Sequence, residues 1–384
     1  TKPLEQWQAF AGELSSMSID FERDAEALRR KQRLRWRSEE QSTLRESLDL
    51  HVLVSKSLIA FRAEERQERI DDLIRRIRDS AQRLAEDHPA RGDMKILSRT
   101  LRELRYAFKV FAPYRKHRKV TVFGSARTPA GEPTYQACVE FGREMAERDW
   151  MVITGAAHGI MEAGHVGAGR DMSMGLNIML PFEQSANAII DGDHKLVNMK
   201  YFFTRKLMFV KECDAVVCYP GGFGTMDEAM EVLTLVQTGK RDVVPIILAD
   251  APGGTYWKKL DEFIREELLA GGMISPEDLH LYSVTEDYKE AADEILQFYK
   301  NYHSMRYVGR DLILRLKQPL TEAALSQINQ DYGDILNSGE FTQTGKLEAE
   351  QDNPETDDMT RLVAHFNRRN HGRLRQLINF INQQ

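Results

Sequence analysis

The sequence predicts an α/β protein: a doubly wound, Rossmann-like parallel sheet, with an N-terminal helical domain and a small C-terminal α/β appendage. Two patterns favour this class. In the middle of the chain, almost wholly apolar runs alternate with helical stretches, as in parallel sheets covered on both faces. Before them, apolar residues recur three or four positions apart among charged ones, as in amphipathic helices. We therefore predict domains at residues 1–117, 118–302 and 303–384.

The first domain is expected to be helical because it contains few helix-breaking residues. Pro89 and Gly92 should separate two of its helices. The apolar residues at helical spacing are Ile70, Leu73, Ile74, Ile77 and Leu84 in one helix, and Ile96, Leu97, Leu101, Leu104, Ala107, Phe108, Val110 and Phe111 in the next.

The central domain should contain a series of buried strands joined by helices. The expected strands are Val120–Phe123, Met151–Ile153, Gly175–Leu180, Ala215–Val217 and Val243–Leu248, and the clearest helices are Tyr135–Arg148 and Gly224–Gln237. In an open sheet of this kind, the ligand binds beyond the carboxyl ends of the strands. The search for a site therefore concentrates on the loops that follow the strands.

The appendage should combine strands and helices. We expect strands at Asp311–Leu316, Phe341–Ala349 and Arg361–Phe366, a helix capped by Thr321 over Thr321–Leu336, and a closing helix over Gly372–Ile381.

Composition excludes several classes of protein. The net charge of −6 argues against a protein that coats nucleic acid, because phosphate neutralisation needs a basic surface. No apolar run reaches the roughly 18 residues of a membrane span. The three cysteines, Cys138, Cys213 and Cys218, have no paired metal-ligand spacing, so we expect a reducing compartment, the cytoplasm, and no metal.

The strongest functional signal is a glycine-rich turn between a buried strand and a helix, Pro220-Gly221-Gly222-Phe223-Gly224-Thr225. Glycines let the backbone approach a ligand without obstruction by a Cβ atom. Thr225 is expected to cap the helix, whose free amides and dipole favour a phosphate. Glu228 follows one turn into that helix. A plain tight turn with a capping glutamate is the alternative.

Two other strands end in similar loops. Gly124 and Ser125 follow the first strand, and the second is followed by Gly155, with Glu162 at the start of the next helix. Either loop alone is typical of an ordinary turn, and Glu162 could merely balance a helix dipole. Further along, Arg205 offers a planar fork to an anion, and Lys206 a point charge. The succession of small-residue loops is stronger evidence than any one of them.

These motifs resemble the Lonely Guy (LOG) family of nucleotide phosphoribohydrolases, which were once mislabelled lysine decarboxylases. The family's Pro-Gly-Gly-x-Gly-Thr-x-x-Glu element is matched at Pro220 to Glu228, and its Arg-Lys-x-x-Met element at Arg205 to Met208. The resemblance covers roughly residues 117 to 302. A Leu-Pro-Phe-Glu-Gln segment from Leu180, together with Asn187, looks like the longer bacterial branch. One loop departs from the family, because Ala156, Ala157 and His158 stand where glycine is more usual.

The resemblance implies a chemistry and a set of roles. Glu228 would stabilise the ribosyl cation and orient water, Arg205 would hold Glu228 and substrate in register, and no cofactor would be needed. The substrate would be bound by Gly124, Ser125, Gly155, Glu162, Lys206, Pro220, Gly221, Gly222, Gly224 and Thr225. The family assembles as dimers with sites near the interface, so a homodimer or larger homo-oligomer is implied. The appendage could bind a small effector.

Other functions stay open at this point. Related proteins of this fold use the same turn only to carry a nucleotide or the molybdenum cofactor, although a carrier would not require both Arg205 and Glu228. Pyridoxal phosphate chemistry needs a Schiff-base lysine in a recognisable frame, and neither Lys206 nor Lys240 has one. A nucleic-acid regulator would rest on a basic stripe of Arg102, Arg105, Lys109, Arg115, Lys116, Arg118 and Lys119, a pattern more typical of a solvated face.

Overall fold

A computed structural model describes residues 70–180, 185–350 and 354–384 of the chain. The chain divides into two compact units, Thr1–Lys95 and Ile96–Gln384. In the first unit, the described residues include a helix over 70–86. The helix α4 (Arg91–Phe111) then begins just after Pro89 and continues into the second unit. Both predicted helices are therefore present, although Gly92 lies in the first turn of α4 rather than in the break.

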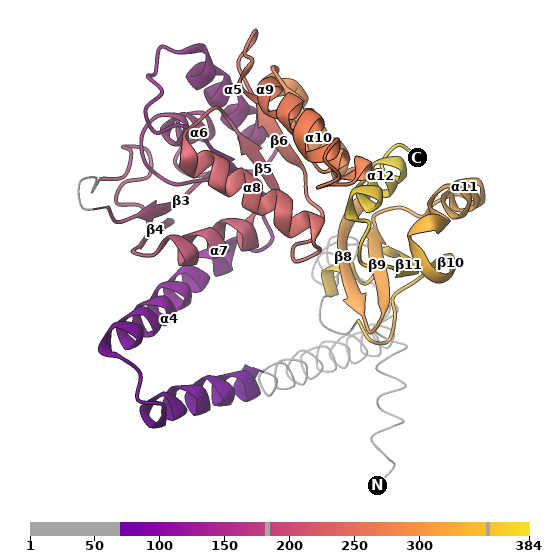
Figure 1. Cartoon of the computed structure of the whole chain (residues 1–384), viewed down its shortest axis with the longest axis horizontal. Coiled ribbons are helices and arrows are strands. Elements are labelled where there is room, and N and C mark those ends of the chain that lie inside the picture. Colours follow the sequence, from indigo (N-terminus) through magenta and orange to yellow (C-terminus); the bar gives the residue numbers. More distant parts are fainter. Residues whose placement is uncertain (1–69, 181–184, 351–353) are drawn as a thin grey trace, which may run out of the picture. The chain divides into compact units, whose positions relative to one another are not determined.

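The second unit is built on a seven-stranded sheet in the order β4-β3-β2-β1-β5-β6-β7 (Figure 1). All pairs in it are parallel, which confirms the predicted doubly wound class. The strands are β1 (Lys119–Phe123), β2 (Met151–Thr154), β3 (Ser173–Ile178), β4 (Leu196–Met199), β5 (Ala215–Cys218), β6 (Ile246–Ala249) and β7 (Ser283–Thr285). The chain winds outward from β1 in both directions, so the order reverses between β1 and β5. Ligands bind at such a reversal in open α/β sheets.

Helices connect the strands and cover the sheet. They are α5 (Pro133–Glu147), α6 (Ile160–Ala168), α7 (Phe202–Glu212), α8 (Phe223–Gln237), α9 (Tyr256–Phe263) and α10 (Tyr288–Phe298). The central strands β1, β2 and β5 are buried along their whole length. Their mostly apolar sequences follow, because both faces lie against helices.

The edge strands were missed by the sequence analysis, and some boundaries were wrong. β4 is alternately buried and exposed and contains an asparagine, and β7 has only three half-buried residues, so neither presents an apolar run. The strand expected at Gly175–Leu180 spans Ser173–Ile178. The strand expected to begin at Val243 begins at Ile246.

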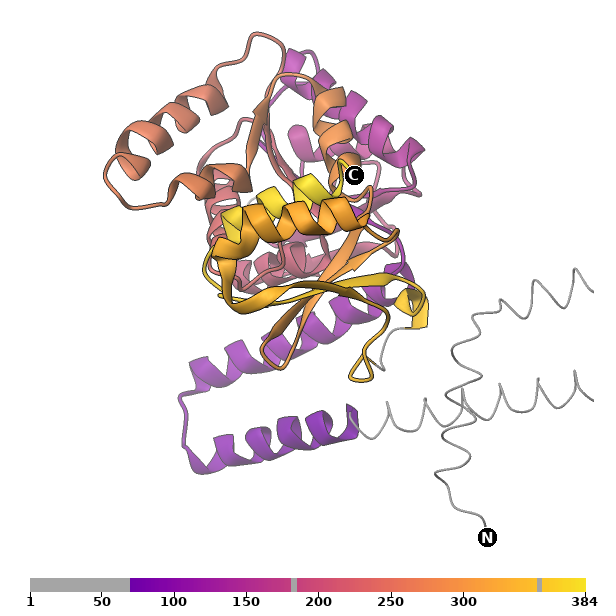
Figure 2. The same cartoon turned by 90° about the vertical axis from the view of Figure 1, so that its right-hand side faces the viewer.

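The appendage is an antiparallel sheet in the order β10-β11-β9-β8. Its strands are β8 (Tyr302–Val308), β9 (Asp311–Leu316), β10 (Leu336–Thr344) and β11 (Thr360–Phe366). The helices α11 (Glu322–Tyr332) and α12 (His371–Ile381) lie on the same side of this sheet (Figure 2).

Two expectations for the appendage need correction. The helix capped by Thr321 ends at Tyr332, and the strand expected at Phe341–Ala349 is β10, which begins at Leu336. Register shifts in the pairing of β10 with β11 disturb the alternation that would have revealed its start. The cap itself is confirmed, because the Thr321 hydroxyl accepts the amide of Ala324.

The three cysteines lie in the hydrophobic core, where burial raises the pKa of each thiol. They therefore behave as small apolar side chains. Among the described residues, no helix is both long and apolar enough to cross a membrane.

A buried carboxylate joins two strands of the appendage. The side chain of Glu350 is 1% exposed, and its Oε1 accepts from Arg315 while Oε2 accepts from Arg361 at 2.8 Å. The side chain of Arg361 is completely buried. The single carboxylate therefore compensates two guanidinium groups that have little access to water.

Substituting Glu350→Ala should leave both charges buried without their partner. We expect the free energy of unfolding to fall by about 3–5 kcal/mol, the usual effect of removing one member of a buried ion pair. Urea denaturation measures the change, with Glu348→Ala as the control because Glu348 is exposed. Equal stability of the two variants would show that the pairing has no such role.

Candidate active site

The backbone of Ser125 joins the loops that follow three neighbouring strands. Its amide donates to the carbonyl of Pro220 at 3.1 Å, and its carbonyl accepts from the amide of Ile160 at 3.0 Å. Ser125 follows β1, Pro220 follows β5, and Ile160 begins α6 after β2. The loops predicted to bind substrate are therefore brought together at the carboxyl ends of the central strands.

Glycine is required where these loops touch. A Cβ atom on Gly221 would lie 2.1 Å from Oγ1 of Thr225 and 2.9 Å from the amide of Ser125. Gly159 has φ +64°, and a Cβ there would lie 2.3 Å from the Ser125 carbonyl oxygen. By contrast, a Cβ on Gly222 or Gly224 would meet nothing within 4 Å. These two face open space, which leaves the backbone accessible to a ligand.

The helix α8 begins at Phe223 with Gly222 as its N-cap, so the expectation that Thr225 caps it was wrong. Thr225 lies inside the first turn, where its amide donates to the carbonyl of Gly222 at 3.0 Å. The sequence suggested Thr225 because threonine is a common N-cap residue, but the helix begins two residues earlier, at Phe223. The first amides of any helix lack intrahelical partners, so the start of α8 still offers donors and a positive dipole end.

Tyr256, which the sequence analysis did not identify, anchors this turn from α9. Its hydroxyl donates to the carbonyl of Gly221 at 2.6 Å. No pattern near Tyr256 indicates this contact, because the residues are distant in sequence and an aromatic residue at a helix start is common.

Glu228 is buried on α8, with a relative exposure of 5%. Burial raises its pKa from the ordinary value to about 7, although the charges of Lys206 and Arg205 lower it. The Nζ atom of Lys206 lies 3.8 Å from Oε2 of Glu228, and this oxygen has no hydrogen-bond partner among the described residues. Such a group can change protonation near neutral pH, as a catalytic acid or base must.

Arg205 reaches the same region from α7. Its guanidinium carbon lies 5.1 Å from the centre of the Phe202 ring and 5.6 Å from that of Phe209. Burial lowers the pKa of Arg205, and the charge of Glu228 raises it in part. The Nε atom is buried without a hydrogen-bond partner. A Cβ on Gly155 would lie 3.6 Å from Nη1 of Arg205, so the guanidinium passes beside the second loop.

Lys206 contacts carboxylates on α8. Its ammonium lies 2.8 Å from Oδ2 of Asp227 and forms a further ion pair with Glu231. Burial lowers the pKa of Lys206, but these carboxylates raise it above the ordinary value, which keeps the ammonium charged. Asp227 and Glu231 are four residues apart and share one face of α8.

Glu162, the other predicted carboxylate, lies on α6 and is half-buried. Its Oε2 is 3.5 Å from Nδ1 of His158 in the preceding loop.

The second loop is held by side chains that sequence reasoning did not assign to it. Ala156 has φ +61°, a conformation that favours glycine. The side-chain amide nitrogen of Asn187 donates to the carbonyls of Ala156 and Ala157, at 3.2 and 3.0 Å. Behind it lies His165, which is completely buried. Burial lowers its pKa to about 4, although hydrogen bonds with the carbonyl of Met174 and the side chain of Asn187 raise it in part. Buried hydrogen bonds thus maintain the loop where the family more often has glycine.

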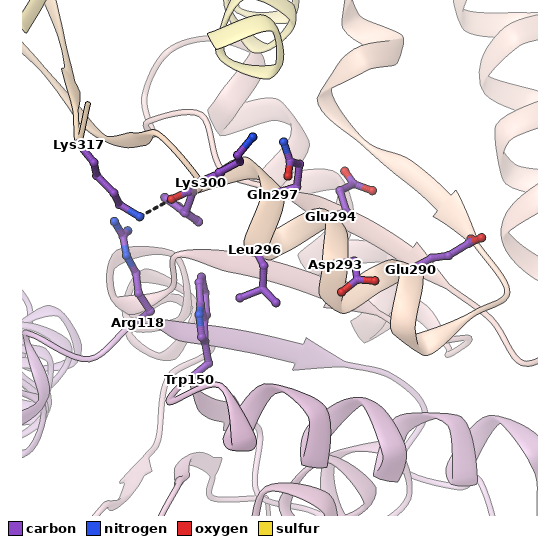
Figure 3. Close-up of a pocket in the computed structure, with 10 residues that line it drawn as sticks. Arg118, Trp150, Glu290, Asp293, Glu294, Leu296, Gln297, Lys300 and Lys317 are labelled. Carbon is purple, nitrogen blue, oxygen red and sulfur yellow. Dashed lines mark hydrogen bonds between the residues drawn. The ribbon is translucent and has the colours of Figure 1, made fainter. Parts of the chain in front are cut away.

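A cavity of about 790 Å³ lies elsewhere (Figure 3). It is lined by Arg118 and Trp150, which precede β1 and β2, by one side of α10, and by Lys317 of the appendage. It therefore lies at the amino ends of the strands, opposite the glycine loops. We place the candidate active site at the loops, because the perturbed carboxylate of Glu228 and the unpartnered atoms of Arg205 and Glu228 lie on the helices beside them. The expectation of an effector at the appendage stays a prediction.

Two further expectations can be compared with the structure. In the part of the chain that the structure describes, no group of three or more His, Cys, Asp or Glu side chains could hold a metal. The predicted basic stripe is interrupted, because Lys119 is 3% exposed and Arg118 forms an ion pair with Asp214 at 2.6 Å.

Known proteins resemble the central region. A family model described as "Possible lysine decarboxylase" matches residues 153–295. A protein of Oryza sativa subsp. japonica, named "Probable cytokinin riboside 5'-monophosphate phosphoribohydrolase", is 27% identical over 188 residues, covering 48% of this chain and 74% of that protein. A cytokinin riboside 5'-monophosphate phosphoribohydrolase of Arabidopsis thaliana is 29% identical over 166 residues, covering 42% and 74% respectively.

Among solved structures, the molybdenum cofactor binding protein of Rippkaea orientalis is 16% identical, with 47% of this chain and 95% of that chain covered. Its TM-score of 0.34 is too low to bear on function. The family match includes the second and third glycine loops, Arg205 and Glu228. These comparisons agree with the resemblance of the central part of the chain to the Lonely Guy (LOG) family.

Proposed function

We propose that this protein hydrolyses the N-glycosidic bond of nucleoside 5′-monophosphates. Water adds its hydroxyl to C1′ of the ribose and a proton to the departing base, so the products are the free base and ribose 5-phosphate. The observation that carries the proposal is a pair of oppositely charged side chains, one half-buried and one buried, each with a buried polar atom that has no hydrogen-bond partner. These are Nε of Arg205 and Oε2 of Glu228. Buried polar atoms without partners are rare in folded proteins, and a bound substrate would satisfy them.

The substrate phosphate would bind at the start of α8. Gly222 and Gly224 are open there, and the unpaired amides and helix dipole favour an anion. Glu228 lies about one turn further along the helix, which would place it near the ribose when the phosphate sits on the loop. Ser125 and Gly155 border the same space through their loops.

Glu228 would act on the ribosyl group. Cleavage develops positive charge on the ribose, which a carboxylate in a water-poor site stabilises strongly. With a pKa of about 7, Glu228 can also accept a proton from the attacking water and return it to the departing base. Arg205 would hold the substrate and Glu228 in register. The activity for which the rice and Arabidopsis relatives are named supports this reaction type.

The first prediction concerns the reaction itself. Purified protein should release base and ribose 5-phosphate from at least one of AMP, GMP, IMP, CMP and UMP, as followed by chromatography. Glu228→Ala and Arg205→Ala should each lower kcat/KM by at least about a hundredfold, the usual effect of losing a charge-stabilising group. Asp149→Asn is the control, since Asp149 is an exposed residue just before β2, at the opposite edge of the sheet from the loops. Tight nucleotide binding without turnover would favour the carrier alternative.

The raised pKa of Glu228 also predicts a pH-dependent stability. Between pH 4.5 and 7 the folded protein holds a proton that the unfolded chain has released, so this group's contribution falls as pH rises through that window. Glu228→Gln should therefore be more stable than the wild type at pH 8, by up to about 3 kcal/mol at about 1.4 kcal/mol per pKa unit. The advantage should shrink as pH falls through that window and disappear below about pH 4.5.

Thermal unfolding across this pH range measures the difference, with Glu144→Gln on α5 as a matched control. A stability difference that does not change between pH 5 and pH 8 would contradict the raised pKa.

We also propose that the protein forms a homo-oligomer through α4 and α7. Large apolar side chains are exposed on both helices: Leu97, Leu101 and Phe108 on α4, and Phe202, Phe203 and Leu207 on α7. Monomeric soluble proteins rarely expose apolar residues in such groups. Arg205 lies on α7 among them, so association would also remove water from the neighbourhood of the site.

Light scattering after size-exclusion chromatography should give a multiple of 44.2 kDa. Leu101→Glu should shift the protein towards the monomer, because it introduces charge into the buried surface. Lys109→Gln, on the same helix and with the same change of net charge, should not. A wild-type mass of 44.2 kDa would refute the assembly.

A further inference from the structure

The helix α4 buries a carboxylate in a stripe that is otherwise apolar. Its buried residues are Glu103, Ala107 and Phe111, spaced four apart. Glu103 is only 5% exposed. A buried carboxylate is strongly unfavourable unless it is hydrogen-bonded and paired, so its partners indicate why it is there.

The partners of Glu103 are at the start of α7. Oε1 accepts from the backbone amide of Lys200 at 2.8 Å, and Oε2 accepts from the hydroxyl of Thr204 at 2.8 Å. On its own helix, Arg99 donates to Oε1 at 2.7 Å. Burial raises the pKa of Glu103, but the hydrogen bonds from Arg99, Lys200 and Thr204 lower it below the ordinary value. The group is therefore a carboxylate anion.

This anion lies beside the start of α7 without capping it, because its partners there are an amide that precedes the N-cap and a side-chain hydroxyl. The N-cap residue of α7, Tyr201, makes no side-chain capping bond. A negative charge at a helix N-terminus also interacts favourably with the helix dipole. The amide of Arg205 donates to the carbonyl of Tyr201 at 3.3 Å. The backbone of Arg205 thus belongs to the turn that Glu103 holds, and Thr204 precedes it directly.

We propose that Glu103 is a positioning residue for Arg205. Glu103, on α4, fixes the first turn of α7 and thereby the position of the Arg205 guanidinium. The charge of this guanidinium in turn affects the pKa of Glu228. The kinetic test of this inference rests on the proposed function, because it measures base release. The inference itself goes beyond that function because Glu103 lies outside the residues matched by the family model, 153–295, and belongs to a helix that precedes the sheet.

The kinetic test compares variants that differ in the contact they remove. Glu103→Ala removes both bonds to the start of α7, and Glu103→Gln keeps the length and one acceptor oxygen. Thr204→Val conserves volume and removes the hydroxyl that bonds Glu103 and the carbonyl of Tyr201. Arg99→Gln is the matched control, because it removes a partner of the same carboxylate without touching α7. We expect kcat/KM to fall by about ten- to a hundredfold in Glu103→Ala, as small displacements of a substrate-positioning group do. Glu103→Gln and Thr204→Val should lie between it and wild type.

The pH profile separates positioning from general stability. The charge of Arg205 lowers the pKa of Glu228. Displacing that charge should therefore move the acidic limb of the kcat/KM profile to higher pH in Glu103→Ala and Thr204→Val, but not in Arg99→Gln. Thr204→Val should fold in any case. The proposal would be overturned if this variant had a lower melting temperature but an unchanged acidic limb of the kcat/KM profile.

Hydrogen exchange gives a readout that does not need activity. A peptide covering 200–208 should exchange faster in Glu103→Ala and Thr204→Val than in wild type and Arg99→Gln. If the wild type releases no base from any nucleotide, the proposed function fails, and exchange alone decides the positioning role. Unchanged exchange in that segment would overturn it.

Discussion

The geometry of the site depends on the two backbone hydrogen bonds of Ser125. With one donor and one acceptor, this residue connects the loop after β1 to the loops after β5 and β2. Both contacts need backbone atoms to approach closely, which explains why Gly159 and Gly221 cannot carry side chains. A parallel sheet brings strand ends to a common edge, but it does not by itself order the loops there. The Ser125 bonds give these loops a common arrangement.

The charged groups are positioned by a second set of contacts, between helices. Lys206 on α7 forms ion pairs with Asp227 and Glu231 on α8, and these carboxylates flank Glu228 along that helix. The contact therefore aligns the helix that carries Arg205 with the helix that carries Glu228. Neither catalytic candidate takes part in many bonds itself, and both keep an unpartnered atom. Ion pairs and backbone hydrogen bonds thus hold the helices and loops around the candidate site, whereas polar atoms of Arg205 and Glu228 inside it have no partner, as expected of a preorganised site.

The sequence predicted those features that lie within short segments. The doubly wound sheet follows from apolar runs that alternate with helices, and the glycine loops, Arg205 and Glu228 stand in contiguous motifs. Features that depend on distant contacts could not be predicted. Glu103 is one of many acidic residues in an amphipathic helix, and only its contact with Lys200 and Thr204 distinguishes it. Tyr256 and Asn187 likewise hold loops far from them in sequence. The edge strands β4 and β7 were missed because a half-exposed strand lacks an apolar run.

The burial of all three cysteines has a practical consequence. Thiols react as thiolates, and burial both shields these sulfur atoms and disfavours their ionisation. The folded wild-type chain thus provides a background almost inert to maleimide reagents. Phe223, which is 95% exposed at the start of α8, is an attractive place to introduce a single reactive cysteine. A fluorophore attached there would lie beside the glycine turn and would report on ligand arrival without removal of any native thiol.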